Sequence, residues 1–339
     1  MNMKKERKTT RPEKIILEET GFRSTQYSYY NNCNSMFCKT MKDLCSSWLQ
    51  KCNDTVKKST YSGYSYCVNT HILPFLGEVP LAGLDGTVIA AFIDKMKEKG
   101  LADTTVHSVL AAFKLILKYA IRLKLLDSRL LEYCSVSCRR PESRVLTLQE
   151  SNRMKEYLLE ENTIFSIAIL LCRSTGMRLG ELCGLKWGDI DFSANTFRIR
   201  RTISRITNPH ASGNEPKTMI YIRPPKSCTS TREIPIPHYL IEPLKKMRKD
   251  TELYLLTGRT TCTEPRNIQK KFKTVLKRCA IEDCNFHAMR HGFATACLEK
   301  GVDCKTVSSI LGHASTRTTM DFYVHTSLRQ KADCINSID

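Results

Sequence analysis

A guanidinium beside a predicted helix start is the first feature of the sequence with a chemical use. An apolar stretch of helical length ends at Gly176, and a new helix is expected within the segment TGMRLGEL, so Arg178 stands at its start. Free backbone N–H groups at a helix start, together with a positive side chain, favour a bound anion. Glu181 follows three residues later, close enough to hold that guanidinium or a neighbouring one. Taken alone, the segment is better explained as an ordinary Arg–Glu pair on a helix surface.

A lysine between two predicted strands could supply a proton. Lys226 lies in the segment PKSCTSTR, which separates two short runs of strand-forming residues. This position predicts a hairpin turn with an exposed, mobile lysine, able to protonate a leaving oxygen. A turn lysine without any such role is the more common case.

A histidine and an arginine share one face of a predicted helix. In the segment FHAMRH, His287 and Arg290 are three residues apart, so both side chains point the same way from a helix. Two donors aimed together suit a phosphate, whose charge is spread over several oxygens. For this pair alone, a surface His and Arg that merely share a helix face are the better explanation.

A second histidine precedes a tyrosine near the end of the sequence. His313 closes the segment LGH, and Tyr323 follows ten residues later in DFYVH. Residues 316–319 can start a short helix that delivers the tyrosine to the other groups. A lone tyrosine at such a position is normally a packing residue, so this cluster is also weak evidence by itself.

The N-terminal part of the sequence predicts four helices after a polar segment of residues 1–38. Thr40 and Asp43 form a capping box for the first helix. The second helix is expected to stop at Pro74 and Gly77, the third covers residues 87–99, and Asp103 is expected to cap the fourth. Residues 39–133 therefore form a helical domain. Its fourth helix carries a basic stripe that could contact phosphates or simply face solvent: Lys114, Lys118 and Arg122.

The rest of the sequence predicts a second domain over residues 147–339, after a linker at 134–146. Thr147 and Glu150 form a capping box, and helices follow at about 148–160 and 163–174. Alternating apolar and polar residues then predict strands at 196–206, 219–222 and 232–236, with helices again from about 266. A basic stretch that includes Lys270 and Lys271 lies in the last helical part. The expected fold is mainly α with a small antiparallel β-sheet.

The charge balance points to a polyanionic partner. Lys and Arg number 53 against 34 Asp and Glu, a net charge of +19. Such an excess favours nucleic acid, although a merely basic protein is not excluded. We find no signal peptide and no apolar run near the roughly 20 residues of a membrane span, which predicts a cytoplasmic protein. The 16 cysteines lack metal-type spacing, so we expect reduced thiols and no metal.

The ordered set of these clusters resembles the active site of the tyrosine recombinases, the phage integrase family. TGMRLGEL, PKSCTSTR, FHAMRH, LGH and a following tyrosine occur in the family's order across about 150 residues. Each motif is weak alone, but together they are specific. Residues 40–130 resemble the helical core-binding domain of the family, and residues 147–330 resemble its catalytic domain.

The resemblance implies a site-specific recombinase, an integrase that cuts and rejoins double-stranded DNA through a 3′-phosphotyrosine. Tyr323 would be the nucleophile, Arg178 and Arg290 would bind the non-bridging oxygens, and His313 would add a hydrogen bond. Lys226 would protonate the leaving 5′ oxygen, and His287 would accept the tyrosine proton. The bond energy is kept in the phosphotyrosine, so neither a cofactor nor a metal is expected. A homotetramer on DNA and a directionality factor are further expectations from the resemblance.

Three other functions remain compatible with the sequence. A recombinase that resolves chromosome or plasmid dimers, of the Xer type, would share every motif with an integrase of a mobile element. A type IB topoisomerase would use the same groups, but the separate helical domain and a predicted helix after Tyr323 favour a recombinase. A non-catalytic DNA-binding regulator is disfavoured because every catalytic position is filled.

Overall fold

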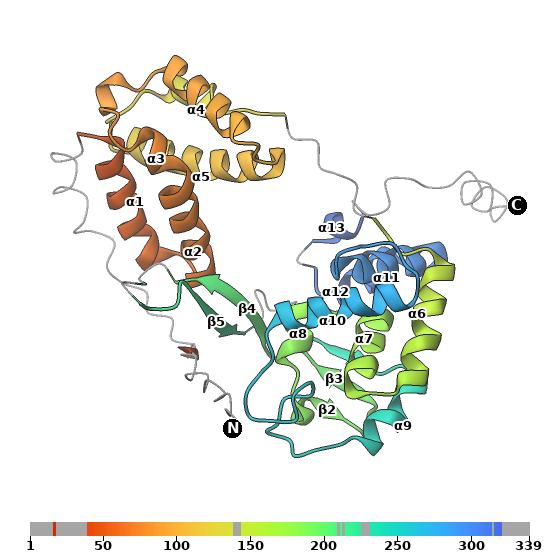
Figure 1. The fold of residues 1–339 in the computed structure, drawn as a ribbon. Coiled ribbons are helices and arrows are strands. Elements are labelled where there is room, and N and C mark those ends of the chain that lie inside the picture. Colours follow the sequence, from red (N-terminus) through yellow and green to blue (C-terminus); the bar gives the residue numbers. More distant parts are fainter. Residues whose placement is uncertain are drawn as a thin grey trace, which may run out of the picture. The chain divides into compact units, whose positions relative to one another are not determined.

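The computed structural model describes residues 16–17, 39–137, 144–208, 211, 214–224, 231–313 and 315–320 (Figure 1). The chain divides into two compact units. The first, the helical unit, contains the described residues between Glu19 and Glu142 together with those between Ile206 and Met219. The second, the mixed unit, contains the other described residues. Residues 206–219, placed by the sequence within the second domain, thus group with the helical unit.

The helical unit is built from α-helices that enclose one apolar core. Its longest helices pack their buried faces together, among them Leu44 of the first, Phe92 of the third long helix and Phe113 of the last. The capping box of Thr40 and Asp43 is present, as predicted. The elements are α1 (Met41–Thr55), α2 (Lys58–Cys67), η1 (Val68–Ile72), α3 (Leu73–Leu76), η2 (Leu81–Gly83), α4 (Gly86–Glu98), α5 (Asp103–Arg122) and η3 (Ser128–Leu131).

Two details of the helical unit differ from the sequence-based expectation. Pro74 does not end the second helix, because a π-helical turn, η1, carries the chain from α2 into α3 and places Pro74 at the start of α3. A proline is tolerated there, since the first N–H groups of a helix have no partner within it. Asp103 is the first residue of α5 rather than its cap, and Ala102 occupies the cap position without a side-chain bond.

Helix α5 is long and apolar enough to cross a membrane by length and composition, whereas the sequence predicted no apolar run of that length. Half of its apolar window is buried within the protein itself. Val106, Phe113 and Leu117 of this helix are among the core residues of the helical unit. We therefore interpret α5 as a core helix, because a helix at the centre of a helical unit is apolar over a wide face.

The mixed unit surrounds its core with helices and holds one three-stranded sheet and most residues of a second. The apolar helix α7 (Ile164–Thr175) packs against its neighbours α6, α9 and α11. The capping box of Thr147 and Glu150 starts α6, as predicted. The remaining elements are α6 (Leu148–Glu161), α8 (Leu179–Gly184), η4 (Trp187–Asp189), α9 (His238–Lys246), α10 (Pro265–Arg278), α11 (His287–Glu299), α12 (Cys304–Leu311) and α13 (Thr316–Met320).

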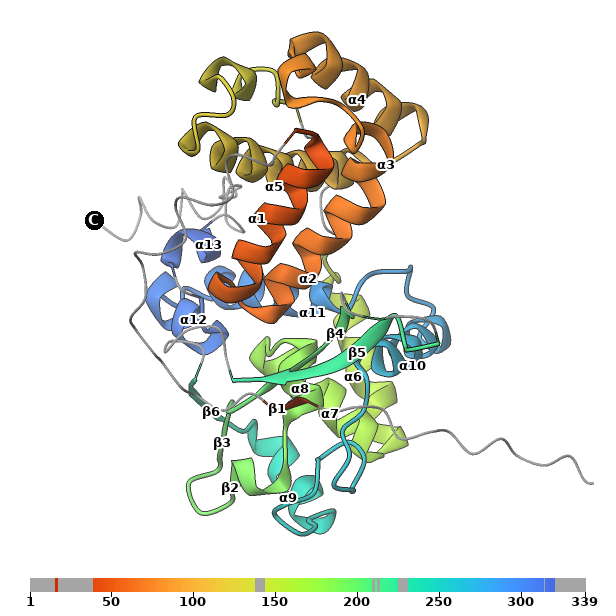
Figure 2. The ribbon, with the colours of Figure 1, turned by 90° about the vertical axis from the view of Figure 1, so that its left-hand side faces the viewer.

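The strands form two sheets where the sequence predicted one. One sheet has the order β2-β3-β6 and is antiparallel, with Phe197 opposite Ile234. The other has the order β1-β5-β4, and Figure 2 shows β4 and β5 side by side with β1 next to β5. The strand β1 runs parallel to β5 and pairs Ile16 with Tyr221. The strands are β1 (Ile16–Leu17), β2 (Ile190–Asp191), β3 (Thr196–Arg198), β4 (Thr202–Thr207), β5 (Thr218–Arg223) and β6 (Glu233–Pro235).

This topology corrects two expectations. The stretch 196–206 is not one strand: it breaks between β3 and β4, which belong to different sheets. The strands that flank Lys226, β5 and β6, also belong to different sheets, so they are not the two arms of a hairpin. The partner of β5 is β4, whereas β6 pairs with β3. Lys226 itself lies outside the described residues.

Candidate active site

Arg178 lies where α7 gives way to α8. Gly176 ends α7 with a φ of 63°, and a Cβ there would be 2.5 Å from Cδ2 of Leu311, so a side chain at this turn would collide with α12. Arg178 then occupies the cap position of α8, as predicted. Its backbone N–H donates to Oε2 of Glu181 over 2.9 Å, and its Nη1 donates to Oε1 over 2.9 Å. Glu181 therefore holds both the backbone and the guanidinium of this arginine.

Three arginines from distant parts of the sequence meet at the C-terminal end of α12. They come from the start of α8, from the residue before β6 and from the first turns of α11. Backbone carbonyls at a helix end carry partial negative charge and are unpaired within the helix, so they attract cations. Arg178 donates to the carbonyls of Leu311 (3.4 Å) and Gly312 (3.2 Å), Arg290 to that of Leu311 (2.9 Å), and Arg232 to that of Ile310 (2.5 Å).

Glu181 is the buried anion of this cluster. Its side chain is 2% exposed and forms ion pairs with Arg178 and with Arg232, each at 2.9 Å. Burial acts to raise the pKa of this carboxyl, but the hydrogen bonds and charges of Arg232 and Arg178 outweigh it, and the pKa lies below its usual value. Glu181 is therefore ionised at neutral pH and binds two guanidiniums, while the third arginine, Arg290, is close enough to be influenced by its charge.

Arg290 is buried, with 3% of its surface exposed. Burial lowers its pKa to about 9, helped by the nearby positive charge of Arg178. Its two terminal nitrogens donate to the carbonyls of Gly176 and Leu311, which fixes the plane of the guanidinium. The group is still protonated at neutral pH, so the cluster keeps a surplus of positive charge that an anion would neutralise.

Two histidines lie next to the arginines. His287 is the first residue of α11, its ring centroid is 5.0 Å from that of His291, and Arg290 follows one turn later. His313 follows Gly312 directly, and its Nδ1 is 2.8 Å from Oγ1 of Thr319. Loss of solvent, followed by neighbouring positive groups, lowers the pKa of both His287 and His313 to about 4. Both rings are thus neutral at pH 7 and able to exchange a proton.

The lowered histidine pKa values predict a pH dependence of stability. An unfolded histidine titrates near 6.5, whereas His287 and His313 titrate at about 4 in the folded chain. Between these values the unfolded chain binds protons that the folded chain does not, so the free energy of unfolding falls as the pH falls from 6.5 to 4. We expect His313→Gln to flatten this profile in urea unfolding at pH 7, 6 and 5. The exposed His107 of α5 provides the control His107→Gln, and equal slopes for all three proteins would contradict the prediction.

The structure unites part of the predicted site. Arg178, Glu181, Arg290 and His313 converge at the end of α12, and His287 lies one turn before Arg290. The other two predicted catalytic residues, Lys226 and Tyr323, lie outside the described residues.

The basic residues predicted to contact DNA are not part of this cluster. Lys270 and Lys271 are exposed on α10, and Nζ of Lys271 lies 5.2 Å from the ring centroid of Phe165. On α5 of the helical unit, Lys118 and Arg122 are exposed and Lys114 is half-buried.

Sequence reasoning missed two residues at the site. Arg232 is the last residue of the quoted segment PKSCTSTR but received no role, although it contacts both Glu181 and α12. His291 follows Arg290 and was likewise passed over, although its ring lies against His287. The only signal for either residue was membership of a motif, since the partner of Arg232 is 51 positions away in the sequence.

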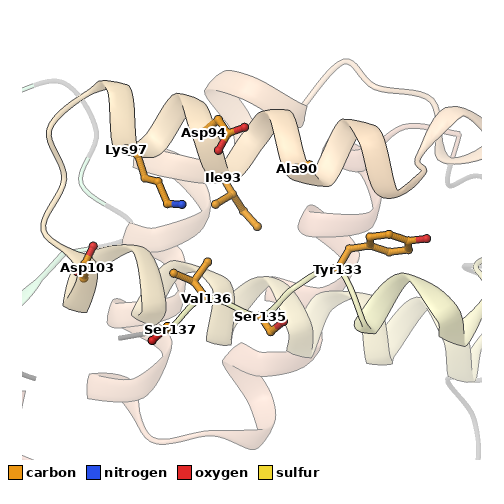
Figure 3. Close-up of a pocket in the computed structure, with 9 residues that line it drawn as sticks. All are labelled: Ala90, Ile93, Asp94, Lys97, Asp103, Tyr133, Ser135, Val136 and Ser137. Atoms are coloured by element: carbon orange, nitrogen blue, oxygen red, sulfur yellow. The ribbon is translucent and has the colours of Figure 1, made fainter. Parts of the chain in front are cut away.

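A separate hollow in the helical unit contains none of these residues. Figure 3 shows it between α4 and the segment that follows η3, with Lys97 and Ile93 on one side and Val136 and Tyr133 on the other. Its volume is about 410 Å³, and its lining mixes apolar groups with Asp94 and serines. It holds no cluster of cations, so we do not assign the reaction to it.

Sequence profiles identify two domains of known families. The profile described as "Phage integrase family" matches residues 144–329, and "Phage integrase, N-terminal SAM-like domain" matches residues 40–97. A tyrosine recombinase XerC-like protein of Caldanaerobacter subterraneus subsp. tengcongensis is 28% identical, over 88% of this chain and 83% of its own length. The ICEBs1 integrase of Bacillus subtilis is 21% identical, over 98% of this chain and 90% of its own.

Solved structures share the fold. The Tn1549 transposon integrase in complex with transposon right end DNA has a TM-score of 0.72 and 21% identity, covering 88% of this chain and 99% of that one. A lambda integrase tetramer bound to a Holliday junction has a TM-score of 0.61 and 18% identity, covering 85% of this chain and 78% of that one. The profile match extends over more than half of the chain and includes the whole arginine and histidine cluster. The chain therefore belongs to the phage integrase family, the tyrosine recombinases, which cleave and rejoin DNA.

Proposed function

We propose that this protein is a site-specific DNA recombinase that integrates or excises a mobile element through a 3′-phosphotyrosine at Tyr323. One observation carries the proposal. Arg178 and Arg290 donate to the same carbonyl, that of Leu311, and this places two guanidiniums side by side with His313 two residues further along the chain. A pair of guanidiniums with surplus positive charge is suited to the two non-bridging oxygens of a phosphodiester, and to the negative charge that builds up on them during reaction. We name Arg178 and Arg290 the arginine clamp.

The proposed reaction exchanges one phosphate ester for another. The phenolate oxygen of Tyr323 attacks the scissile phosphorus, a bond to tyrosine forms, and the bond to the 5′ oxygen breaks. Lys226 gives its proton to that leaving oxygen, and His287 takes the proton of the tyrosine hydroxyl. The ring of His287 is neutral at pH 7, so one of its nitrogens can accept a proton, and its low pKa makes it a weak base. His313 donates a hydrogen bond to the clamped phosphate.

The free 5′ hydroxyl of a second strand reverses the step. It attacks the phosphotyrosine, forms a new DNA ester and releases Tyr323, with each proton returning along the same path. The number of ester bonds is unchanged, so the reaction draws on no nucleotide and no metal. The positive charges that stabilise the transition state also favour the phenolate form of a nearby tyrosine, whose reference pKa is about 10.

Double-stranded DNA is the proposed partner, in line with the net charge of +19. We propose that the helical unit contacts the backbone through Lys114, Lys118 and Arg122, and that Lys270 and Lys271 of α10 add contacts from the mixed unit. A homotetramer on DNA is supported by the lambda integrase tetramer bound to a Holliday junction, which shares the fold. We also propose that a directionality factor is a further partner and that the protein is cytoplasmic.

The main alternative is a recombinase of the Xer type that resolves chromosome or plasmid dimers. The XerC-like relative supports it through the higher identity, whereas the ICEBs1 integrase supports a mobile element because its match extends over nearly the whole of both chains. Because the match to the ICEBs1 integrase covers more of both chains, we favour a recombinase of a mobile element.

A plasmid with two target sites tests the activity. The sites are copies of the DNA that flanks the protein's own gene, placed in direct repeat on a supercoiled plasmid. A recombinase yields two smaller circles. Relaxed plasmid without exchange would indicate a topoisomerase instead, and binding without either product would indicate a regulator. Activity on the chromosomal dimer site with none on the flanking DNA would favour the Xer-type alternative.

A further inference from the structure

Arg232 lies at the centre of the cluster but does not belong to the proposed clamp. Its side chain is 7% exposed, and it donates to Oε1 and Oε2 of Glu181 over 3.2 and 2.9 Å and to the carbonyl of Ile310 over 2.5 Å. A Cβ on Gly312 would lie 2.8 Å from its Nη1, so the glycine leaves the space that this guanidinium needs. A buried arginine with this many partners is held in one orientation.

Glu181 binds two arginines, so its negative charge is divided between them. Its Oε1 accepts from the guanidiniums of Arg178 and Arg232, and its Oε2 accepts from the backbone N–H of Arg178 and from Arg232. Without Arg232, the whole carboxylate charge would face Arg178. A carboxylate paired with a single guanidinium neutralises it and can bind it with both oxygens. Arg178 would then have less positive charge to offer a phosphate.

The contact with α12 links Arg232 to the second clamp residue. Arg232 holds the carbonyl of Ile310, and the next carbonyl, that of Leu311, accepts from both Arg178 and Arg290. The end of α12 is therefore fixed by the same side chain that orients Glu181. A shift of this helix end would move the acceptors of both clamp guanidiniums together.

We infer that Arg232 is a positioning residue for the arginine clamp: it shares the charge of Glu181 and fixes the end of α12, so that Arg178 and Arg290 present their charge to the phosphate. The inference rests on the proposed function, because it needs a phosphate between the two arginines. Arg232 does not touch the DNA in this scheme. Its effect on rate passes through Glu181 and α12.

The test compares two DNA substrates for each protein variant. One is a nicked duplex with the normal scissile phosphate, and the other has a neutral methylphosphonate at the same position. A weakened clamp matters less when the phosphate charge is absent, so the ratio of the cleavage rates, methylphosphonate over phosphate, should rise. For Arg232→Met we expect a loss of about 100-fold on the phosphate, as for a misplaced catalytic group, and a ratio at least about tenfold above wild type. Arg232→Lys should resemble Arg232→Met, because lysine lacks the fork that binds both oxygens of Glu181.

The ratio separates positioning from folding. A smaller folded fraction lowers both rates equally and leaves their ratio unchanged, so a wild-type ratio in Arg232→Met would overturn the inference even if total activity falls. The matched control is Arg198→Met, because Arg198 forms an exposed ion pair with Glu233, the residue after Arg232. We expect the control to keep the wild-type rates and ratio, and a raised ratio there would count against a role specific to Arg232.

A clamp variant distinguishes this inference from the proposed function. Arg178→Ala must raise the ratio if the proposed clamp is correct. A raised ratio in Arg178→Ala with a wild-type ratio in Arg232→Met would reject the positioning role alone. An unchanged ratio in Arg178→Ala would reject the clamp, and the role of Arg232 with it.

Discussion

Replacement of Tyr323 by phenylalanine is expected to abolish covalent capture of DNA while DNA binding persists. The substitution removes one oxygen, the atom that would attack the phosphorus, and leaves the arginine and histidine cluster unchanged. Loss of a nucleophile that acts in concert with its neighbours costs on the order of 10⁴-fold or more in rate. We therefore expect no covalent product on nicked duplexes after Tyr323→Phe. DNA affinity should stay within about threefold of wild type, because the substitution leaves the lysines and arginines proposed to contact phosphates unchanged.

The measurement is a denaturing gel of protein incubated with nicked duplexes, followed by proteolysis of the retarded band. The nick lets the short strand diffuse away, so the covalent intermediate accumulates. The control is Tyr133→Phe, which removes a hydroxyl from an exposed tyrosine of the helical unit and should behave as wild type. A retarded band that persisted in Tyr323→Phe, or a DNA-linked peptide without Tyr323, would show that another residue is the nucleophile.

Glu181→Ala, which removes the buried carboxylate, is expected to lower the free energy of unfolding more than Glu181→Gln or the removal of an exposed carboxylate. Glu181→Ala breaks the ion pair with Arg232, whose side chain is 7% exposed. Removal of one partner of a buried ion pair costs about 3–5 kcal/mol, which is a large part of the stability of a typical domain. Glu181→Gln keeps the shape and one carbonyl acceptor, so we expect a smaller loss. The exposed control Glu233→Ala, which breaks the pair with Arg198, should cost about 0–1 kcal/mol.

Fluorescence can report on the unit that contains Glu181. The chain has two tryptophans, Trp48 in the helical unit and Trp187 in the mixed unit. In a Trp48→Phe background, urea unfolding followed by fluorescence therefore monitors the mixed unit, and each midpoint shift at constant slope gives a change in stability. Equal losses of stability for Glu181→Ala and Glu233→Ala would contradict the conclusion that Glu181 forms a buried ion pair.

The pH dependence gives an independent check on the same carboxylate. The folded pKa of Glu181 lies below its unfolded value of 4.5, because the arginines outweigh the effect of burial. The ionised carboxylate therefore adds stability above pH 4.5, and this stability is lost as the pH falls through the folded pKa. We expect the difference between wild type and Glu181→Gln to narrow below pH 4.5, and a difference that is constant with pH would argue against an ion pair.

Local signals in the sequence were sufficient for most of the secondary structure. The capping boxes at Thr40 and Thr147 depend on residues three positions apart, and both are present. The start of α8 at Arg178 was likewise readable, because Gly176 ends the preceding apolar helix. Such features follow from neighbouring residues, so one sequence suffices to predict them.

Features that depend on distant pairing were not predictable in the same way. The expected hairpin at Lys226 was wrong because alternation identifies a strand but not its partner, and β5 and β6 join different sheets. The role of Arg232 was missed for the same reason, since Glu181 and Ile310 are far from it in the sequence. The cap of α5 is Ala102, one residue before the expected cap Asp103, a difference within the usual uncertainty of helix ends.

The convergence of three arginines on the end of α12 also sets the order in which the site can form during synthesis. Chains fold from the N-terminus as they leave the ribosome. The side chains of Arg178, Arg232 and Arg290, however, donate hydrogen bonds to the backbone carbonyls of residues 310–312, which are synthesised later. If the helical unit contacts DNA as proposed, a nascent chain that has already folded this unit binds DNA before its clamp exists. The protein would therefore acquire DNA-cutting ability only when the last part of the chain has been made, and fragments truncated before α12 should bind DNA without nicking it.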